Sequence, residues 1–286
     1  MSILTAIIQA VLQALSWILP ISEYGHSSLF HDFAGRATGS CSAITGVIHI
    51  GIAIGILISS YKLFLTLSKE FFGTFKDLFR KQIKGSSKSP ARSFMYMTLI
   101  SFVPMILWLI PTGKNGFLFA LLRKTGFNGT LLDDGIFFAI TGLLVLAAAK
   151  QLSLARNNKN VSVLFAVVVG VLSIFLVPVS GLSLTAGIFA VLMLLGVSKK
   201  LSFRYSIVMS VPVLIVMGIA QICTAVISAG AVEIILGVII SAAVSFIAVK
   251  LLQWIINANK LKFFGIYDIG IGVIAIIIGI FELILK

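Results

Sequence analysis

The chain has 286 residues, of which 59% are hydrophobic and 11% charged, and its formal net charge is +13. This composition, with a mean hydropathy of +1.14, excludes an ordinary soluble domain and predicts an all-α polytopic membrane protein. A β-barrel is excluded because its strands alternate apolar and polar residues, whereas runs such as 269–281 are apolar throughout. No basic and aromatic surface remains outside the spans, so we expect no nucleic-acid partner.

The first apolar segment, residues 3–35, is broken at Pro20 and carries Gln13, Ser22, Glu23 and His26. Unsatisfied polar groups at bilayer depth are costly, so such residues must be buried in protein or line a wet cavity. The segment therefore predicts a re-entrant helical hairpin that holds a binding site. The first Lys or Arg of the chain is Arg36, so the basic region that opens a signal peptide is missing and we expect no signal peptide.

His26 is the main candidate for chemistry in this hairpin. It follows Ser22 by four residues, so the two share one face of a continuous helix, with Glu23 turned away. His26 could act as a nucleophile, a general base or a cationic phosphate contact, or it could only hydrogen-bond a neighbouring helix. Its clustering with Glu23 beside the proline favours a functional role.

Six full spans are predicted, near 42–60, 92–112, 134–152, 203–225, 234–256 and 264–284. His49 lies in the middle of the first span, and we expect it to line the site because ionisable groups at this depth face the bundle interior. The stretch 62–92 mixes phenylalanines with basic residues, which is typical of an interfacial amphipathic helix or of an ordinary basic loop. The two cysteines, Cys41 and Cys223, are interpreted as buried thiols.

A second broken segment, residues 161–197, resembles the first. Val177-Pro178-Val179-Ser180 parallels Leu19-Pro20-Ile21-Ser22. Two such breaks predict one membrane domain built from an inverted repeat, about 1–125 and 130–286, with the hairpin tips meeting near the midplane. After the second break, the hydroxyls and glycines could cradle phosphate or form a small-residue packing surface; these residues are Ser180, Gly181, Ser183 and Thr185.

With this topology, basic residues sort to one side of the membrane. All but five of the 22 Lys and Arg residues fall on one side, and the other side keeps Arg36, Lys114, Arg123, Lys124 and Lys286. The basic side is predicted to be cytoplasmic, which places the first hairpin on the outer side.

These motifs resemble the bacterial undecaprenyl-pyrophosphate phosphatase family over nearly the whole chain. The family's first motif overlays the stretch from Gln13 to His26 without a gap, and its second overlays 180–185. Further similarity lies at 47–51, 195–198, 205–206, 211–212 and 266–268. The resemblance implies six spans with two re-entrant hairpins and an outward-opening site in a bacterial plasma membrane. It also implies hydrolysis of the terminal phosphate of undecaprenyl diphosphate, typically with a divalent cation, in cell-wall lipid-carrier recycling.

The chain departs from the family pattern at charged positions. Trp17 stands where the family has a carboxylate, and Leu184 stands where it has an arginine. Loss of such an arginine can cost a factor of about 10³–10⁵ in rate. Glu23 and Asp268 could restore a site for Mg²⁺ or Ca²⁺, and His49 with His26 could replace the missing cation.

Two functional interpretations follow, with a plainer third. In the first, the protein is a hydrolase in which His26, with Ser22 and Glu23, acts on the diphosphate. Its substrate-binding residues would be Gln13, Gly25, His49, Ser180, Gly181, Ser183 and Thr185. In the second, it binds or translocates polyprenyl phosphate without turnover, since opposed hairpins are also a transporter architecture. In the third, it is a membrane assembly partner; a homo-oligomer is possible in each case.

Overall fold

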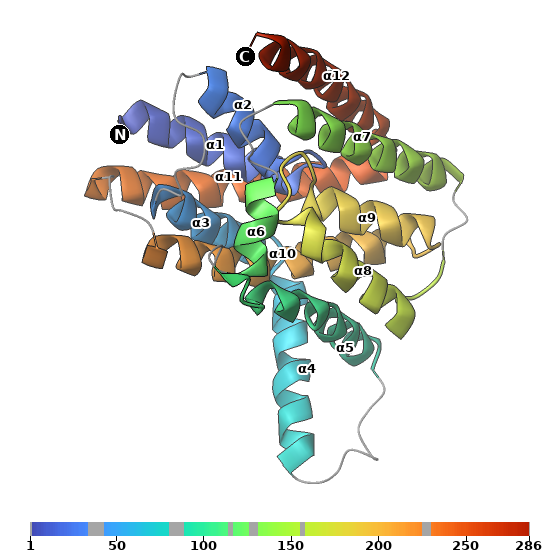
Figure 1. Ribbon diagram of the computed structural model, residues 1–286. Helices are drawn as coiled ribbons and strands as arrows, with labels where there is room; N and C mark the ends of the chain where they lie inside the picture. The colour runs from blue at the N-terminus through green and yellow to red at the C-terminus, as the bar shows by residue number, and fades with distance from the viewer. Residues whose placement is uncertain are drawn as a thin grey trace.

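The computed structural model describes residues 2–33, 43–79, 89–113, 117–125, 131–154, 158–224 and 230–285. Within these ranges the chain forms α-helices and one longer 3-10 helix, with no β-sheet (Figure 1). The elements in order are α1 (Ile3–Ile18), α2 (Glu23–Phe33), α3 (Ala43–Ser59), α4 (Tyr61–Phe79), α5 (Pro90–Phe102), η2 (Pro104–Leu109), α6 (Leu118–Thr125), α7 (Leu131–Leu154), α8 (Val163–Leu176), α9 (Leu184–Leu194), α10 (Lys199–Thr224), α11 (Ala231–Asn257) and α12 (Lys262–Ile284).

Five helical segments in the described ranges are long and apolar enough to cross a membrane: α5 with η2, α7, α10, α11 and α12. A sixth is counted if α3 and α4, which pass the same test only as a pair bent by 91°, make one span. These segments coincide with the six predicted spans. The protein is therefore a multi-pass helical membrane protein.

The two predicted hairpins are α1 with α2 and α8 with α9. Their helices have 16, 11, 14 and 11 residues, fewer than the roughly 20 that cross the hydrocarbon. α1 ends before Pro20, and the Ser22 hydroxyl caps α2 by accepting a hydrogen bond from Gly25 N at 3.1 Å. α8 likewise ends before Pro178, and Ser183 caps α9.

Glycine pairs bring transmembrane helices that are far apart in the chain into close contact. On α7 and α12, a Cβ at Gly135 would lie 2.7 Å from the Gly272 carbonyl oxygen, and the reverse distance is also 2.7 Å. Gly142 and Gly265 make the same kind of close contact farther along the same two helices. Such small-residue contacts let membrane helices approach closely.

Each hairpin is followed by three apolar helical segments: α3, α5 with η2, and α7 after the first, and α10, α11 and α12 after the second. Among these segments, α3 packs against both α10 and α11, and α7 packs against α12. Gly46 and Gly218 make the reciprocal contact between α3 and α10. The division into repeats at about 1–125 and 130–286 stays a prediction.

The stretch after α3 is a helix from Tyr61 to Phe79, so the basic-loop interpretation is wrong there; residues 80–88 lie outside the described ranges. α4 projects from the other helices (Figure 1). Its exposed phenylalanines contact one another along the helix, with ring centroids 5.7–5.8 Å apart; they are Phe71, Phe72, Phe75 and Phe79. Arg92 ties α4 to α5, because its guanidinium donates to Glu70 at 2.9 Å and to Asp77 at 2.8 Å.

The expectation of buried thiols is wrong for Cys223, which is exposed in the last turn of α10. That end of the helix lies beyond the close contact between Gly218 and Gly46, so its outer face is left uncovered. Cys41 lies outside the described residues.

Candidate functional site

The tips of the two hairpins meet, as the sequence predicts. The Thr185 hydroxyl at the start of α9 donates a hydrogen bond of 2.8 Å to the carbonyl oxygen of Trp17 at the end of α1. Gly25 of α2 faces the second tip so closely that a Cβ there would lie 3.1 Å from Gly181 N. A narrow crevice between the tips is lined by residues of both; they are Ser16, Trp17, Glu23, Tyr24, Leu176, Val177, Leu182, Ser183 and Leu184.

Gly181 fixes the second tip against α7. Its φ of +84° is a left-handed conformation that favours glycine, and a Cβ would lie 2.6 Å from the Asp134 carbonyl oxygen. Its own carbonyl oxygen accepts a hydrogen bond of 2.9 Å from the Thr141 hydroxyl. The backbone of Gly181 thus packs the tip and holds its shape.

Some hydroxyl groups at the hairpin tips make hydrogen bonds that hold the tips in shape, whereas one is left without a partner among the described residues. Ser22 and Ser183 cap α2 and α9, and Thr185 is bonded to the first tip. The Ser180 hydroxyl is buried and has no hydrogen-bond partner among the described residues. Of these serines, Ser180 therefore has the most freedom to bind a polar ligand.

His26 is held in a defined orientation between α2 and α12. Its Nδ1 lies 2.6 Å from the Ser22 carbonyl oxygen, and its Nε2 lies 3.0 Å from the Tyr267 hydroxyl. A carbonyl oxygen only accepts, so Nδ1 carries the proton and the neutral ring keeps its lone pair on Nε2. Nε2 is the atom that could attack phosphorus or take a proton.

Tyr267 is a site residue that sequence reasoning did not select. Its ring stacks on His26 with a centroid distance of 5.8 Å and an interplanar angle of 11°. Phe138 of α7 packs edge-on against the imidazole from another side, at 5.2 Å. The signal was present in the similarity at 266–268, but only the fold brings positions 241 residues apart into contact.

Glu23 and His49 form a second polar group behind the crevice. Glu23 Oε1 lies 3.8 Å from His49 Nε2, and both side chains are buried. The His49 ring lies 5.5 Å from the Trp17 ring and 6.4 Å from that of Tyr24, measured between centroids. Glu23 is thus turned toward His49, and the role of His49 in lining the site stays a prediction.

Several buried polar atoms near the tips have no hydrogen-bond partner within the described part of the chain. They are Gln13 Oε1, Trp17 Nε1, Glu23 Oε2, both ring nitrogens of His49 and Ser180 Oγ. Buried polar groups are normally satisfied by protein, water or ligand. The hairpin tips therefore enclose a polar interior that suits water or an incoming polar group.

The two predicted metal ligands, Glu23 and Asp268, are both buried, and the metal site stays a prediction. Asp268 is fully buried on α12 and its two carboxylate oxygens lack partners in the described ranges. Neither Asp268 nor Glu23 belongs to a described cluster of three or more His, Cys, Asp or Glu side chains that could hold a metal ion.

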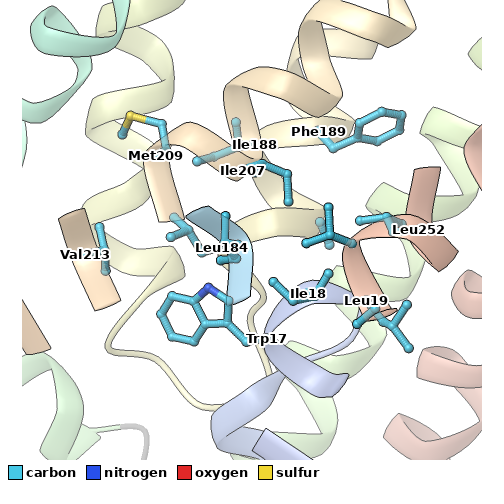
Figure 2. Packing of buried hydrophobic residues seen from close by; sticks show 14 of the residues in the cluster. Trp17, Ile18, Leu19, Leu184, Ile188, Phe189, Ile207, Met209, Val213 and Leu252 are labelled. Carbon is cyan, nitrogen blue, oxygen red and sulfur yellow. The ribbon is translucent and has the colours of Figure 1, made fainter. Parts of the chain in front are cut away.

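The exchanged residues Trp17 and Leu184 both line the crevice. Each is only 5% exposed, and both belong to the buried apolar cluster between the hairpins (Figure 2). The crevice has a volume of about 10 Å³, room for about one water molecule. A diphosphate could enter only if the two tips moved apart.

The fold and this site define a class: a multi-pass helical membrane protein with two opposed re-entrant hairpins and a polar interior where their tips meet. Residues 6–274 match the model of the family described as bacitracin resistance protein BacA, and the chain belongs to this family.

Curated relatives are similar over almost their full length. An undecaprenyl-diphosphatase of Methanosphaera stadtmanae is 30% identical over 98% of this chain and 99% of its own length. Proteins of the same name from Methanococcus vannielii and Halothermothrix orenii are each 27% identical, over 91% and 98% of this chain and 94% and 100% of their own lengths.

Proposed function

We propose that this protein hydrolyses the terminal phosphate of a polyprenyl diphosphate lipid, as the name of its relatives states for them. The observation that carries the proposal is the fixed His26 imidazole, whose Nε2 lone pair faces the Tyr267 hydroxyl. Membership of the family and the polar interior between the hairpin tips support it. The role in cell-wall lipid-carrier recycling rests on the same relatives.

In this proposal His26 reacts through Nε2 in either of two ways. As a nucleophile, Nε2 bonds to the terminal phosphorus, the bridging P–O bond breaks and polyprenyl monophosphate leaves; water then releases inorganic phosphate from the histidine. As a general base, Nε2 takes the proton of a water that attacks the same phosphorus, the bridging P–O bond breaks, and polyprenyl monophosphate and inorganic phosphate are released. In both, donation from Nδ1 to the Ser22 carbonyl oxygen keeps the ring in the reactive tautomer.

Glu23 is the carboxylate that faces the crevice, and we propose that a divalent cation, Mg²⁺ or Ca²⁺, enters together with the diphosphate. Such a cation would offset the negative charge of the phosphates. Asp268 is assigned no contact with substrate in this scheme. The distribution of basic residues supports a plasma-membrane site that opens to the outer face.

The second candidate is a protein that binds or translocates polyprenyl phosphate without turnover. Trp17 and Leu184 favour it, because they supply apolar surface to a crevice of about 10 Å³ where a phosphatase of this type needs charge.

One assay separates the two candidates. Purified protein in detergent is given undecaprenyl diphosphate, with Mg²⁺, with Ca²⁺ or with a chelator, and inorganic phosphate is measured. Release that falls to background in His26→Ala supports the hydrolase, whereas full release by that variant contradicts the role of His26. No release by the wild type, together with specific binding of the monophosphate, supports the second candidate.

A further inference from the structure

An apolar groove lies beside the candidate site, on the other side of Tyr24. Its volume is about 480 Å³, within the range of about 300–1,000 Å³ that is typical of small-molecule sites. It is built by η2, Phe117, α6 and the end of α10. Its lining residues include Trp108, Phe117, Phe119, Arg123, Met217 and Gln221.

Arg123 connects this groove to the candidate site. It lines the groove, and its guanidinium carbon lies 4.8 Å from the centroid of the Tyr24 ring. Tyr24 in turn lines the crevice together with Glu23. A guanidinium presents five N–H donors, so one end of the groove offers a contact for an anion next to the hairpin tips.

Gln221 is a second, independent polar feature of the groove. It is 4% exposed, and neither its amide nitrogen nor its amide oxygen has a hydrogen-bond partner among the described residues. A buried amide without partners is costly unless a ligand or water satisfies it. The groove therefore combines apolar walls with a cationic and an amide hydrogen-bonding group.

We propose that this groove binds the phosphate-proximal isoprene units of a prenyl phosphate lipid, with Arg123 holding the phosphate and Gln221 hydrogen-bonding the headgroup. Arg123 then supplies from α6 the positive charge that Leu184 does not supply at the second hairpin. This inference rests on the proposed lipid substrate class, but it concerns binding and does not require hydrolysis.

The test compares the binding of farnesyl monophosphate with that of farnesol, its uncharged counterpart, to the full-length protein in detergent. Intrinsic tryptophan fluorescence reports binding, because Trp108 lines the groove. Arg123→Gln should weaken farnesyl monophosphate binding about 10- to 100-fold and leave farnesol binding unchanged, since only the phosphate loses a charged hydrogen bond. Arg123→Lys should lie between the two, and Lys124→Gln, a change at the exposed neighbour on α6, should bind as the wild type does.

Two further variants test the groove itself. Gln221→Leu should weaken binding of the phosphate ligand more than that of the alcohol, and Ala120→Phe, which fills the groove without adding a tryptophan, should weaken both. The proposal is overturned if Arg123→Gln binds farnesyl monophosphate like the wild type, if it loses both ligands equally, or if the wild type binds neither ligand.

The phosphate-release assay keeps this inference distinct from the proposed function. Binding that depends on Arg123 without phosphate release would retain the groove and reject the hydrolase. Release that is unaffected by Arg123→Gln, together with unchanged binding, would retain the hydrolase and reject the groove.

Discussion

His26 Nε2 and the Tyr267 hydroxyl lie 3.0 Å apart and join the first re-entrant hairpin to the last helix of the chain. The hydroxyl donates to the lone pair that we assign to chemistry, so this hydrogen bond must break before Nε2 reacts.

Tyr267→Phe removes that hydrogen bond and keeps the ring stacked on His26. Because a neutral hydrogen bond contributes about 1 kcal/mol, we expect phosphate release from undecaprenyl diphosphate to rise by up to about fivefold. The measurement is kcat/KM in detergent, with His26→Ala as the background. A decrease of similar size would instead make Tyr267 a residue that positions substrate.

The exchanged residues of the crevice offer a gain-of-function test. The double variant W17E/L184R places a carboxylate and a guanidinium on the two sides of the crevice. We expect phosphate release to rise by about tenfold or more, because charged donors at such a site stabilise the transition state. The neutral variant W17Q/L184M controls for the loss of bulk. A folded W17E/L184R protein no faster than this control would show that these exchanges do not limit turnover.

Gly181→Ala tests the tight contact between the second hairpin and α7. The new Cβ would lie 2.6 Å from the Asp134 carbonyl oxygen at a φ of +84°, so we expect a loss of roughly 1–3 kcal/mol in unfolding free energy. Thermal unfolding in detergent measures it. Gly270→Ala is the matched control, since no atom lies within 4 Å of its Cβ; it should be neutral or stabilising by up to about 1 kcal/mol. Equal melting temperatures for the two variants would contradict the assigned packing.

α4 is predicted to lie on the membrane surface. If α3 crosses the bilayer, the 91° bend directs α4 along the interface, where exposed phenylalanines and lysines suit lipid chains and anionic headgroups. With Cys41 and Cys223 replaced by serine, a bimane label at Phe72→Cys should be quenched by brominated lipids in nanodiscs, and a label at Lys69→Cys should be quenched less. Water-like emission from both positions would contradict an interfacial helix.

The contact of α4 with α5 should weaken in acid. Hydrogen bonds from Ser89 and Arg92 lower the pKa of Glu70 below its usual value. A carboxyl group with a lowered pKa in the folded state stabilises it above its unfolded pKa, and this contribution is lost as the pH falls through the folded value. The distribution of distances between spin labels at Phe75→Cys and Leu99→Cys should therefore stay unchanged from pH 7 to about 5 and become broader below about pH 4. When Glu70→Gln is added, the distance distribution should already be broad at pH 7. An unchanged distribution in that variant would contradict the role of Glu70 in holding α4 against α5.

The sequence by itself determined the class of the protein and the placement of its elements. Apolar runs of spanning length predict the six spans, and proline breaks in two shorter segments predict the hairpins. These features depend on local composition and on the thickness of the bilayer, both of which can be read along the chain.

Only the tertiary structure decided how the candidate site is assembled. The partner of His26 lies on α12, Glu23 faces His49, and Arg123 reaches Tyr24 from a short helix between the two halves. It also showed that Ser22 and Ser183 serve as helix caps and that the crevice is nearly closed by Trp17 and Leu184. These outcomes depend on how helices far apart in the chain pack, through glycine contacts whose register no local pattern specifies.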